Sequence, residues 1–150
     1  MTTAINPQTN FANLTLAGLQ LLIPQNDVHS LEPATDIWLN RDDSPVVGFF
    51  QQSQQQWPLY ALSASLQPLS RRPASYRIVV LMKNALMPYG LLCEQISVLK
   101  NGQFSLHELP CAMQGANSPL SHLVHHNAKI YCASSAQLLC ELFTAQRQDA

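Results

Sequence analysis

The sequence predicts a mainly β fold that ends in a single helix, and three observations support this prediction. Residues 77–99, RIVVLMKNALMPYGLLCEQISVL, contain two apolar runs joined by a short turn. A second pair of apolar runs lies within residues 46–62, on either side of a polar stretch. Apolar residues recur clearly at helical spacing only over residues 134–146. Together these patterns place a β-hairpin at the centre of an apolar core.

The central hairpin is predicted from residue type and periodicity. Ile78–Met82 is β-branched and aliphatic, which is typical of a strand buried on both faces. Lys83-Asn84 then supplies turn residues. Tyr89–Leu99 follows as the second strand, because its apolar residues recur with a period nearer two than 3.6. Pro88 cannot donate to a β-ladder, so we place it at a strand start or an edge.

The N-terminal region is polar before its first apolar run. We expect residues 1–16 to form a loose segment ahead of a single domain of residues 17–150. Leu19–Ile23 predicts a strand that enters a turn at Pro24. Asp27–Leu31 fits either a short strand or one helical turn, and it ends at Glu32 because a residue before proline avoids the helical conformation.

Residues 46–62 predict a second hairpin. Val46–Phe50 is one strand and Trp57–Leu62 is the return strand. The short glutamine-rich stretch between them, Gln51–Gln56, is bounded by apolar runs on both sides. We therefore expect it to be a polar hairpin loop rather than a low-complexity domain.

The chain after residue 99 predicts further strands and the closing helix. Lys100–Gln103 contains Asn-Gly, which favours a tight hairpin turn before the alternating segment Phe104–Leu109. Ala128–Ala133 alternates as a final strand. In the helix Ser134–Gln146, Ser134 and Gln137 stand at capping-box spacing. The apolar face of this helix comprises Leu138, Leu139, Leu142 and Phe143.

Composition and charge exclude several classes of function. Charged residues make up 11% of the chain, against roughly 25% in typical soluble domains. The net charge is −1 and no basic stripe is present, which disfavours nucleic-acid binding. The apolar runs are too short to span a membrane, and no secretory signal is visible, so we expect a cytoplasmic protein. No two cysteines stand at CxxC spacing, and we expect all of them to be reduced thiols. They are Cys93, Cys111, Cys132 and Cys140.

Four segments in this order resemble the CheW-like domain of bacterial chemotaxis coupling proteins over most of residues 17–143. Tyr89–Leu99, YGLLCEQISVL, is similar to the family's "GLLVDEVSEVL". Leu21–Pro24 resembles an early strand of the family, and the hairpin of residues 46–62 resembles its glycine-containing hairpin. Lys129–Cys132 and the closing helix stand where the family has its last strand and helix.

This resemblance implies a particular fold and function. The fold would be two small intertwined SH3-like β-barrels that share an apolar core. The function would be that of a non-catalytic adaptor without a cofactor, which joins a CheA-like histidine kinase, a chemoreceptor or both in a chemosensory or pilus-type system. The hairpin departs from the family at its tip, where Gln51–Gln56 replaces an Asn-Leu-Arg-Gly motif. We expect the hairpin to carry protein binding through Val47, Phe49, Gln51, Gln54, Trp57 and Tyr60.

An alternative hypothesis is a small β-barrel enzyme or a metal- or ligand-binding protein. His122, His125 and His126 could bind a metal if a cysteine such as Cys111 or Cys132 supplied a further ligand. The interpretation that competes with metal binding is a solvent-facing loop whose histidines have no ligand. Cys93 lies within an apolar run, which favours inert packing over nucleophilic catalysis.

Overall fold

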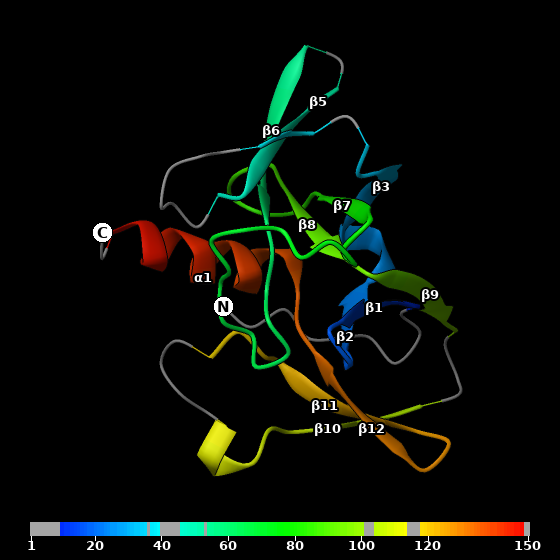
Figure 1. The fold of residues 1–150 in the computed structure, drawn as a ribbon. Helices are drawn as coiled ribbons and strands as arrows, with labels where there is room; N and C mark the ends of the chain where they lie inside the picture. Colours follow the sequence, from blue (N-terminus) through cyan, green and yellow to red (C-terminus); the bar gives the residue numbers. More distant parts are fainter. Residues whose placement is uncertain are drawn as a thin grey trace.

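Two six-stranded β-sheets with one α-helix beside them make up the described part of the computed structural model (Figure 1). The structure describes residues 10–35, 37–39, 46–52, 54–100, 104–113 and 118–148. The mainly β prediction with a C-terminal helix is confirmed.

The first sheet has the strand order β10-β11-β12-β2-β1-β9. Neighbouring strands are antiparallel except β12 and β2, which are parallel. Its strands are β1 (Phe11–Leu16), β2 (Leu19–Pro24), β9 (Gln95–Leu99), β10 (Ser105–His107), β11 (His122–His126) and β12 (Lys129–Ala133).

The second sheet has the strand order β3-β7-β8-β6-β5-β4. Here β6 and β8 are the parallel pair. Its strands are β3 (Val28–Pro33), β4 (Trp38–Leu39), β5 (Gly48–Gln52), β6 (Gln55–Tyr60), β7 (Ile78–Met82) and β8 (Tyr89–Cys93). The remaining elements are two 3-10 turns, η1 (Gln25–Asp27) and η2 (Cys111–Met113), and the helix α1 (Ala136–Gln148).

The N-terminal prediction is wrong for residues 11–16, which form β1 in the interior of the first sheet. Residues 1–9 of the expected loose segment lie outside the described residues. β1 is buried on both faces, because Leu14 packs into one core while Phe11 packs into another. Asn13 and Thr15 interrupt the apolar pattern in the sequence, and both are half-buried in β1. A doubly buried strand that contains polar residues gives only a weak sequence signal.

The predicted single strand Tyr89–Leu99 is two strands that belong to different sheets. β8 pairs with β7 in the second sheet, whereas β9 pairs with β1 in the first. The chain crosses at Glu94, whose backbone N–H donates to the Thr15 carbonyl at 2.9 Å. The Glu94 carboxylate accepts a hydrogen bond from the Ala17 N–H at 2.6 Å. This residue therefore fixes one of the points at which the chain passes between the two sheets; η1, between β2 and β3, is another.

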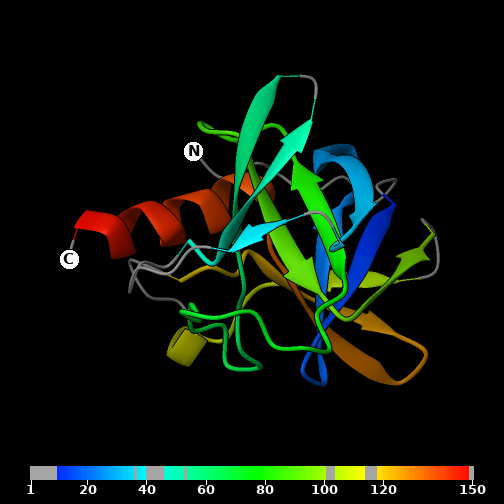
Figure 2. The ribbon, with the colours of Figure 1, turned by 45° about the horizontal axis from the view of Figure 1, so that its top comes forward.

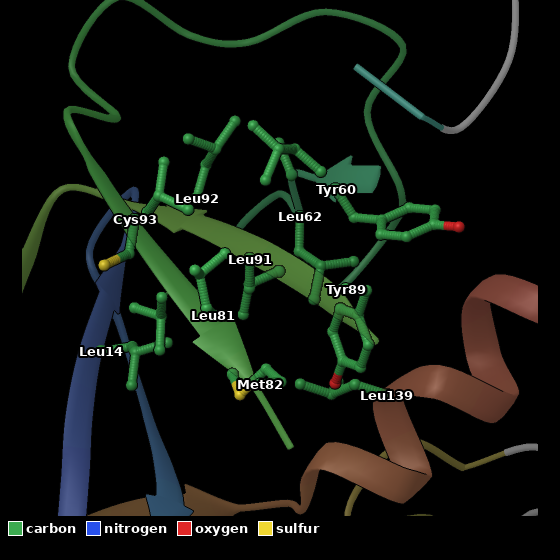
Figure 3. Close-up of a cluster of buried hydrophobic side chains, with 14 of the residues drawn as sticks. Leu14, Tyr60, Leu62, Leu81, Met82, Tyr89, Leu91, Leu92, Cys93 and Leu139 are labelled. Atoms are coloured by element: carbon green, nitrogen blue, oxygen red, sulfur yellow. The ribbon is translucent and has the colours of Figure 1, made fainter. Parts of the chain in front are cut away.

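A shared apolar core, here called the main core, connects both sheets and the helix. Figure 3 shows Leu14 of β1, Leu81 and Leu91 of the second sheet and Leu139 of α1 within one cluster, and each is fully buried. A smaller cluster, here called the second cluster, lies on the other face of the first sheet and contains Phe11, Leu22, Val124 and Ala133. The expectation of two β units that share an apolar core is thus confirmed.

Helix α1 is fastened to the second sheet by aromatic contacts and a buried hydrogen bond. Phe143 stacks on Tyr60 with ring centroids 4.0 Å apart and ring planes 7° apart. The Tyr89 hydroxyl donates to the carbonyl of Ala136 at 2.7 Å. Figure 2 shows the helix lying beside the sheets, while the tip of the β5–β6 hairpin extends beyond the other strands of the second sheet.

The N-cap of this helix is Ser135 rather than the predicted Ser134. The Ser135 hydroxyl accepts a hydrogen bond from the Leu138 N–H at 3.1 Å, which is the N-cap geometry. Ser134 is instead buried, and its hydroxyl donates to the Pro119 carbonyl. The expected tight hairpin at Lys100–Gln103 is also wrong, because β9 pairs with β1 and β10 pairs with β11. Residues 101–103 themselves lie outside the described residues.

Candidate functional site

The β5–β6 hairpin is longer than the sequence predicts, because most of the glutamine stretch is part of the strands. Gln51 pairs with Gln56, and Gln52 pairs with Gln55. Only residues 53 and 54 remain between the strands, and Gln54 adopts a positive φ of 65°. The prediction of a six-residue polar loop is therefore wrong. The hairpin carries no charged residue from Gly48 to Tyr60.

The hairpin has one buried face and one accessible face. Phe50 and Trp57, which pair across the strands, are buried. Phe49 pairs with Pro58 on the other face, where both are half-buried. The exposed pair of Gln51 and Gln56 continues this accessible face toward the tip. The accessible face therefore offers a small apolar base and neutral amides as hydrogen-bonding groups.

The structure separates the six residues predicted for protein binding into two groups. Val47, Trp57 and Tyr60 are buried, with exposed fractions of 2%, 6% and 2%. They belong to the main core and pack the hairpin against the rest of the protein. Gln51 and Gln54 are exposed, and Phe49 is half-buried. These last three are the predicted residues that a partner can reach.

The buried face of the hairpin is further held by two contacts with β3. The His29 ring stacks on Trp57 with centroids 5.4 Å apart and planes 24° apart. The Gln52 amide donates to the Glu32 carboxylate at 2.9 Å. These contacts connect β3, at one edge of the second sheet, with β6 and β5, three and four strands away in the strand order, so the sheet curls toward a barrel.

The histidines of the alternative hypothesis lie on strand β11 and not in a loop. Side chains alternate along a strand, so His122 and His126 point to one face of the sheet and His125 points to the other. His125 instead lies beside His107 of β10, with ring centroids 6.3 Å apart. Among the described residues, no group of three His, Cys, Asp or Glu side chains is placed to hold a metal ion. The three histidines of the alternative hypothesis are therefore not brought together as a metal site in the described part of the chain.

All four cysteines are free thiols, and burial raises the pKa of two of them. Cys93 is fully buried in β8, and burial raises its pKa from 9.0 to about 12, with a smaller contribution from the Glu94 carboxylate. Burial also raises the pKa of Cys132. Cys140 is buried and Cys111 is exposed. Since a reactive cysteine needs an accessible thiolate, Cys93 has the properties of a packing residue.

Sequence reasoning missed the most exposed large apolar side chain of the described residues. Leu86, in the connection between β7 and β8, is 84% exposed. The available signal was a leucine in a short connection between two buried strands. The other exposed large apolar residues are Leu31, Val98 and Ile130.

Two β units around one core, joined at Glu94 and closed by a helix, define a CheW-like fold. The crystal structure of the scaffolding protein TtCheW from Thermoanaerobacter tengcongensis is similar to this chain, with a TM-score of 0.70 and 13% sequence identity. The match covers 88% of this chain and 92% of that protein. No protein-family model matches the sequence, and no curated protein is significantly similar to it. No helix in the described residues has the length and apolarity needed to cross a membrane.

Proposed function

We propose that this chain is a non-catalytic adaptor of a bacterial chemosensory or pilus-type signalling system. It acts in the cytoplasm and binds a CheA-like histidine kinase, a chemoreceptor or both. The observation that carries this proposal is the likeness in fold to a CheW scaffolding protein over 88% of the chain. The unactivated Cys93 thiol and the separated histidines of β11 support a role without catalysis.

We further propose that the accessible face of the β5–β6 hairpin forms part of the docking surface. Phe49 and Pro58 provide its apolar base, and the exposed residues Gln51, Gln54 and Gln56 lie between that base and the tip of the hairpin. Buried Trp57 and Tyr60 hold the strands that present these side chains. Because the hairpin is uncharged, binding through it depends on apolar and hydrogen-bond contacts and varies little with salt.

The test uses the purified chain with the CheA-like kinase and the receptor cytoplasmic fragments of its own organism. Isothermal titration calorimetry should detect a complex with at least one of them. The double variant Gln51→Glu/Gln54→Glu should raise the Kd by about tenfold or more, because it places unpaired charges in a neutral interface. Gln67→Glu and Gln95→Glu are matched controls, since both glutamines are exposed and lie outside the hairpin.

The possible outcomes test the adaptor function and the position of its docking surface separately. Absence of binding to every kinase and receptor fragment contradicts the adaptor proposal. Binding that the Gln51→Glu/Gln54→Glu variant leaves unchanged contradicts the hairpin as a docking surface and leaves the adaptor proposal intact. A steep salt dependence of wild-type binding also contradicts docking through the neutral hairpin.

A further inference from the structure

Strand β9 is a free edge of the first sheet. It is the last strand in the order β10-β11-β12-β2-β1-β9, and among the described residues it pairs with β1 alone. Figure 1 shows it at the outer rim of the molecule, beyond β1. The backbone N–H and C=O groups on its outer side therefore have no neighbouring strand to bond in the described part of the chain.

The other three sheet edges carry features that hinder pairing with a further strand. In the described residues, β10 has three residues and β4 has two. β3 has six, but its register with β7 shifts between Val28 and Ser30, and the strand ends at Pro33. Short strands, bulges and prolines are devices by which proteins protect exposed edges. β9 lacks them, because its sequence QISVL has no proline and no charged residue, and its register with β1 is continuous.

The apolar face of the first sheet continues to this edge. Val98 is 52% exposed, although its partner across the strands, Ala12, is buried in the main core. Ile96 points to the same face as Val98 and is half-buried against the main core. A further strand on the outer side of β9 would therefore cover apolar side chains as well as bond the backbone.

The geometry of β9 allows it to pair with a second copy of itself. In an antiparallel pair, residues that stand opposite each other point to the same face of the sheet. A two-fold axis perpendicular to the sheet must therefore pass beside a residue and not between two residues. Ser97 is the middle residue of β9, so an axis beside Ser97 is the one position that pairs all five residues of the strand.

This register brings complementary side chains together. Ile96 of one copy stands opposite Val98 of the other, on both sides of the axis, so a β-branched residue covers the exposed valine. Just beyond the strand, Glu94 of one copy stands opposite the exposed Lys100 of the other. The Glu94 Oε1 accepts from the Ala17 N–H, and the second carboxylate oxygen can accept from the lysine. Unlike charges therefore face each other at both ends of the paired segment.

We infer that β9 is a homodimerisation surface, at which two copies of this chain pair their β9 strands antiparallel around Ser97. The first sheets of the two copies then form one continuous sheet. Both free edges are used in this two-fold contact, so assembly stops at a dimer. The β5–β6 hairpin belongs to the second sheet and takes no part in the pairing, so the dimer carries two hairpins. The inference concerns this chain alone and does not depend on the proposed adaptor function.

Sedimentation velocity of the purified chain over a series of concentrations measures the dimer. Five paired residues in each copy make a small interface, so we expect a Kd on the order of 10–100 μM. Val98→Lys places a charge on the apolar side of the edge and should raise this Kd by about tenfold or more. Ile130→Lys is the matched control, because Ile130 is also exposed but lies in β12, an interior strand of the same sheet. It should leave the Kd within about twofold.

Cysteine cross-linking tests the register without changing Val98. The background is Cys111→Ser, which removes the exposed thiol. Ser97→Cys then sets two thiols opposite each other at the axis, with Cβ atoms about 4.5–5.5 Å apart. Diamide, which takes up the two thiol hydrogens, should convert the dimer to a disulfide-linked form on a non-reducing gel. Gln95→Cys is the matched control, because the two copies of this exposed position lie roughly 14 Å apart, too far for a disulfide.

Each outcome supports or overturns the inference. A chain that remains monomeric at about 1 mM overturns it, and so does a dimer that Val98→Lys leaves unchanged. Cross-linking of Gln95→Cys as fast as Ser97→Cys overturns the register around Ser97. If the wild type is monomeric and Val98→Lys weakens binding to the CheA-like kinase, the strand that pairs with β9 belongs to the kinase and the assigned occupant is wrong. Sedimentation and cross-linking use this chain alone, so the adaptor proposal stands or falls separately.

Discussion

Burial decides the chemistry of individual residues in this protein. Cys93 is the last residue of β8 and has no exposed surface, and Leu14 of β1 lies near it in the main core (Figure 3). Its thiol is kept protonated because burial, followed by the Glu94 carboxylate, raises its pKa to about 12. An unfolded cysteine titrates near 9.0, so between these values the unfolded chain releases a proton that the folded chain retains.

This difference predicts a loss of stability at alkaline pH. The contribution of Cys93 to the free energy of unfolding is fully present below pH 9 and falls as the pH rises toward 12. At about pH 10.5 the wild type should have lost about 1–2 kcal/mol through this residue. Cys93→Val removes the titrating group, so its stability, measured by urea unfolding, should fall less steeply above pH 9. Tyr76 and Tyr89, whose pKa values burial also raises, are present in both chains. Equal slopes would show that Cys93 ionises freely in the folded protein.

Elements that carry a strong local pattern could be predicted from the sequence, whereas elements defined by their partners could not. Ile78–Met82 has a continuous apolar pattern, and the predicted strand matches β7. The division of Tyr89–Leu99 at Glu94 depends on pairing with β1, which is distant in the sequence. The capping serine was misplaced by one residue, because Ser134 and Ser135 are chemically identical and only tertiary contacts distinguish them.

The assignment of the helix cap gives a prediction at this scale. Ser135→Ala removes the hydroxyl that accepts from the Leu138 N–H, and it should lower the free energy of unfolding by about 1 kcal/mol. It should also accelerate amide exchange at Leu138, because that N–H loses its partner. Ser134→Ala is the matched comparison: it removes a bond to Pro119 and should leave exchange at Leu138 unchanged. If amide exchange at Leu138 is instead faster in Ser134→Ala, the N-cap is Ser134, as the sequence predicts.

The candidate site could be located from the sequence, but its accessible residues could not be chosen. The hairpin was recognised from its two apolar runs, yet Val47, Trp57 and Tyr60 face the core. Trp57 and Tyr60 point to opposite faces of β6, and Tyr60 is buried because Phe143 of the distant helix α1 stacks on it, which no local pattern reveals.

At the scale of the whole molecule, the main core makes the two sheets depend on each other. Leu14 of the first sheet packs in the same core as Leu81 and Leu91 of the second. Both tryptophans lie in the second sheet, Trp38 in β4 and Trp57 in β6, so tryptophan fluorescence reports on that sheet. The chain crosses between the sheets at Glu94 without a linker. These features favour one cooperative unfolding transition over two independent ones.

A substitution in one sheet should therefore be detected by a probe in the other. Leu14→Ala removes fully buried atoms from the first sheet and should cost about 2–5 kcal/mol. In urea titrations, the midpoint of tryptophan fluorescence should fall together with the midpoint of far-ultraviolet circular dichroism, because loss of the shared core destabilises both sheets. Ile130→Ala, at an exposed position of the first sheet, should move neither midpoint appreciably. A fluorescence midpoint that stays at the wild-type value in Leu14→Ala would mean that the second sheet folds independently. The shared core would then be a contact between two domains and not the centre of one.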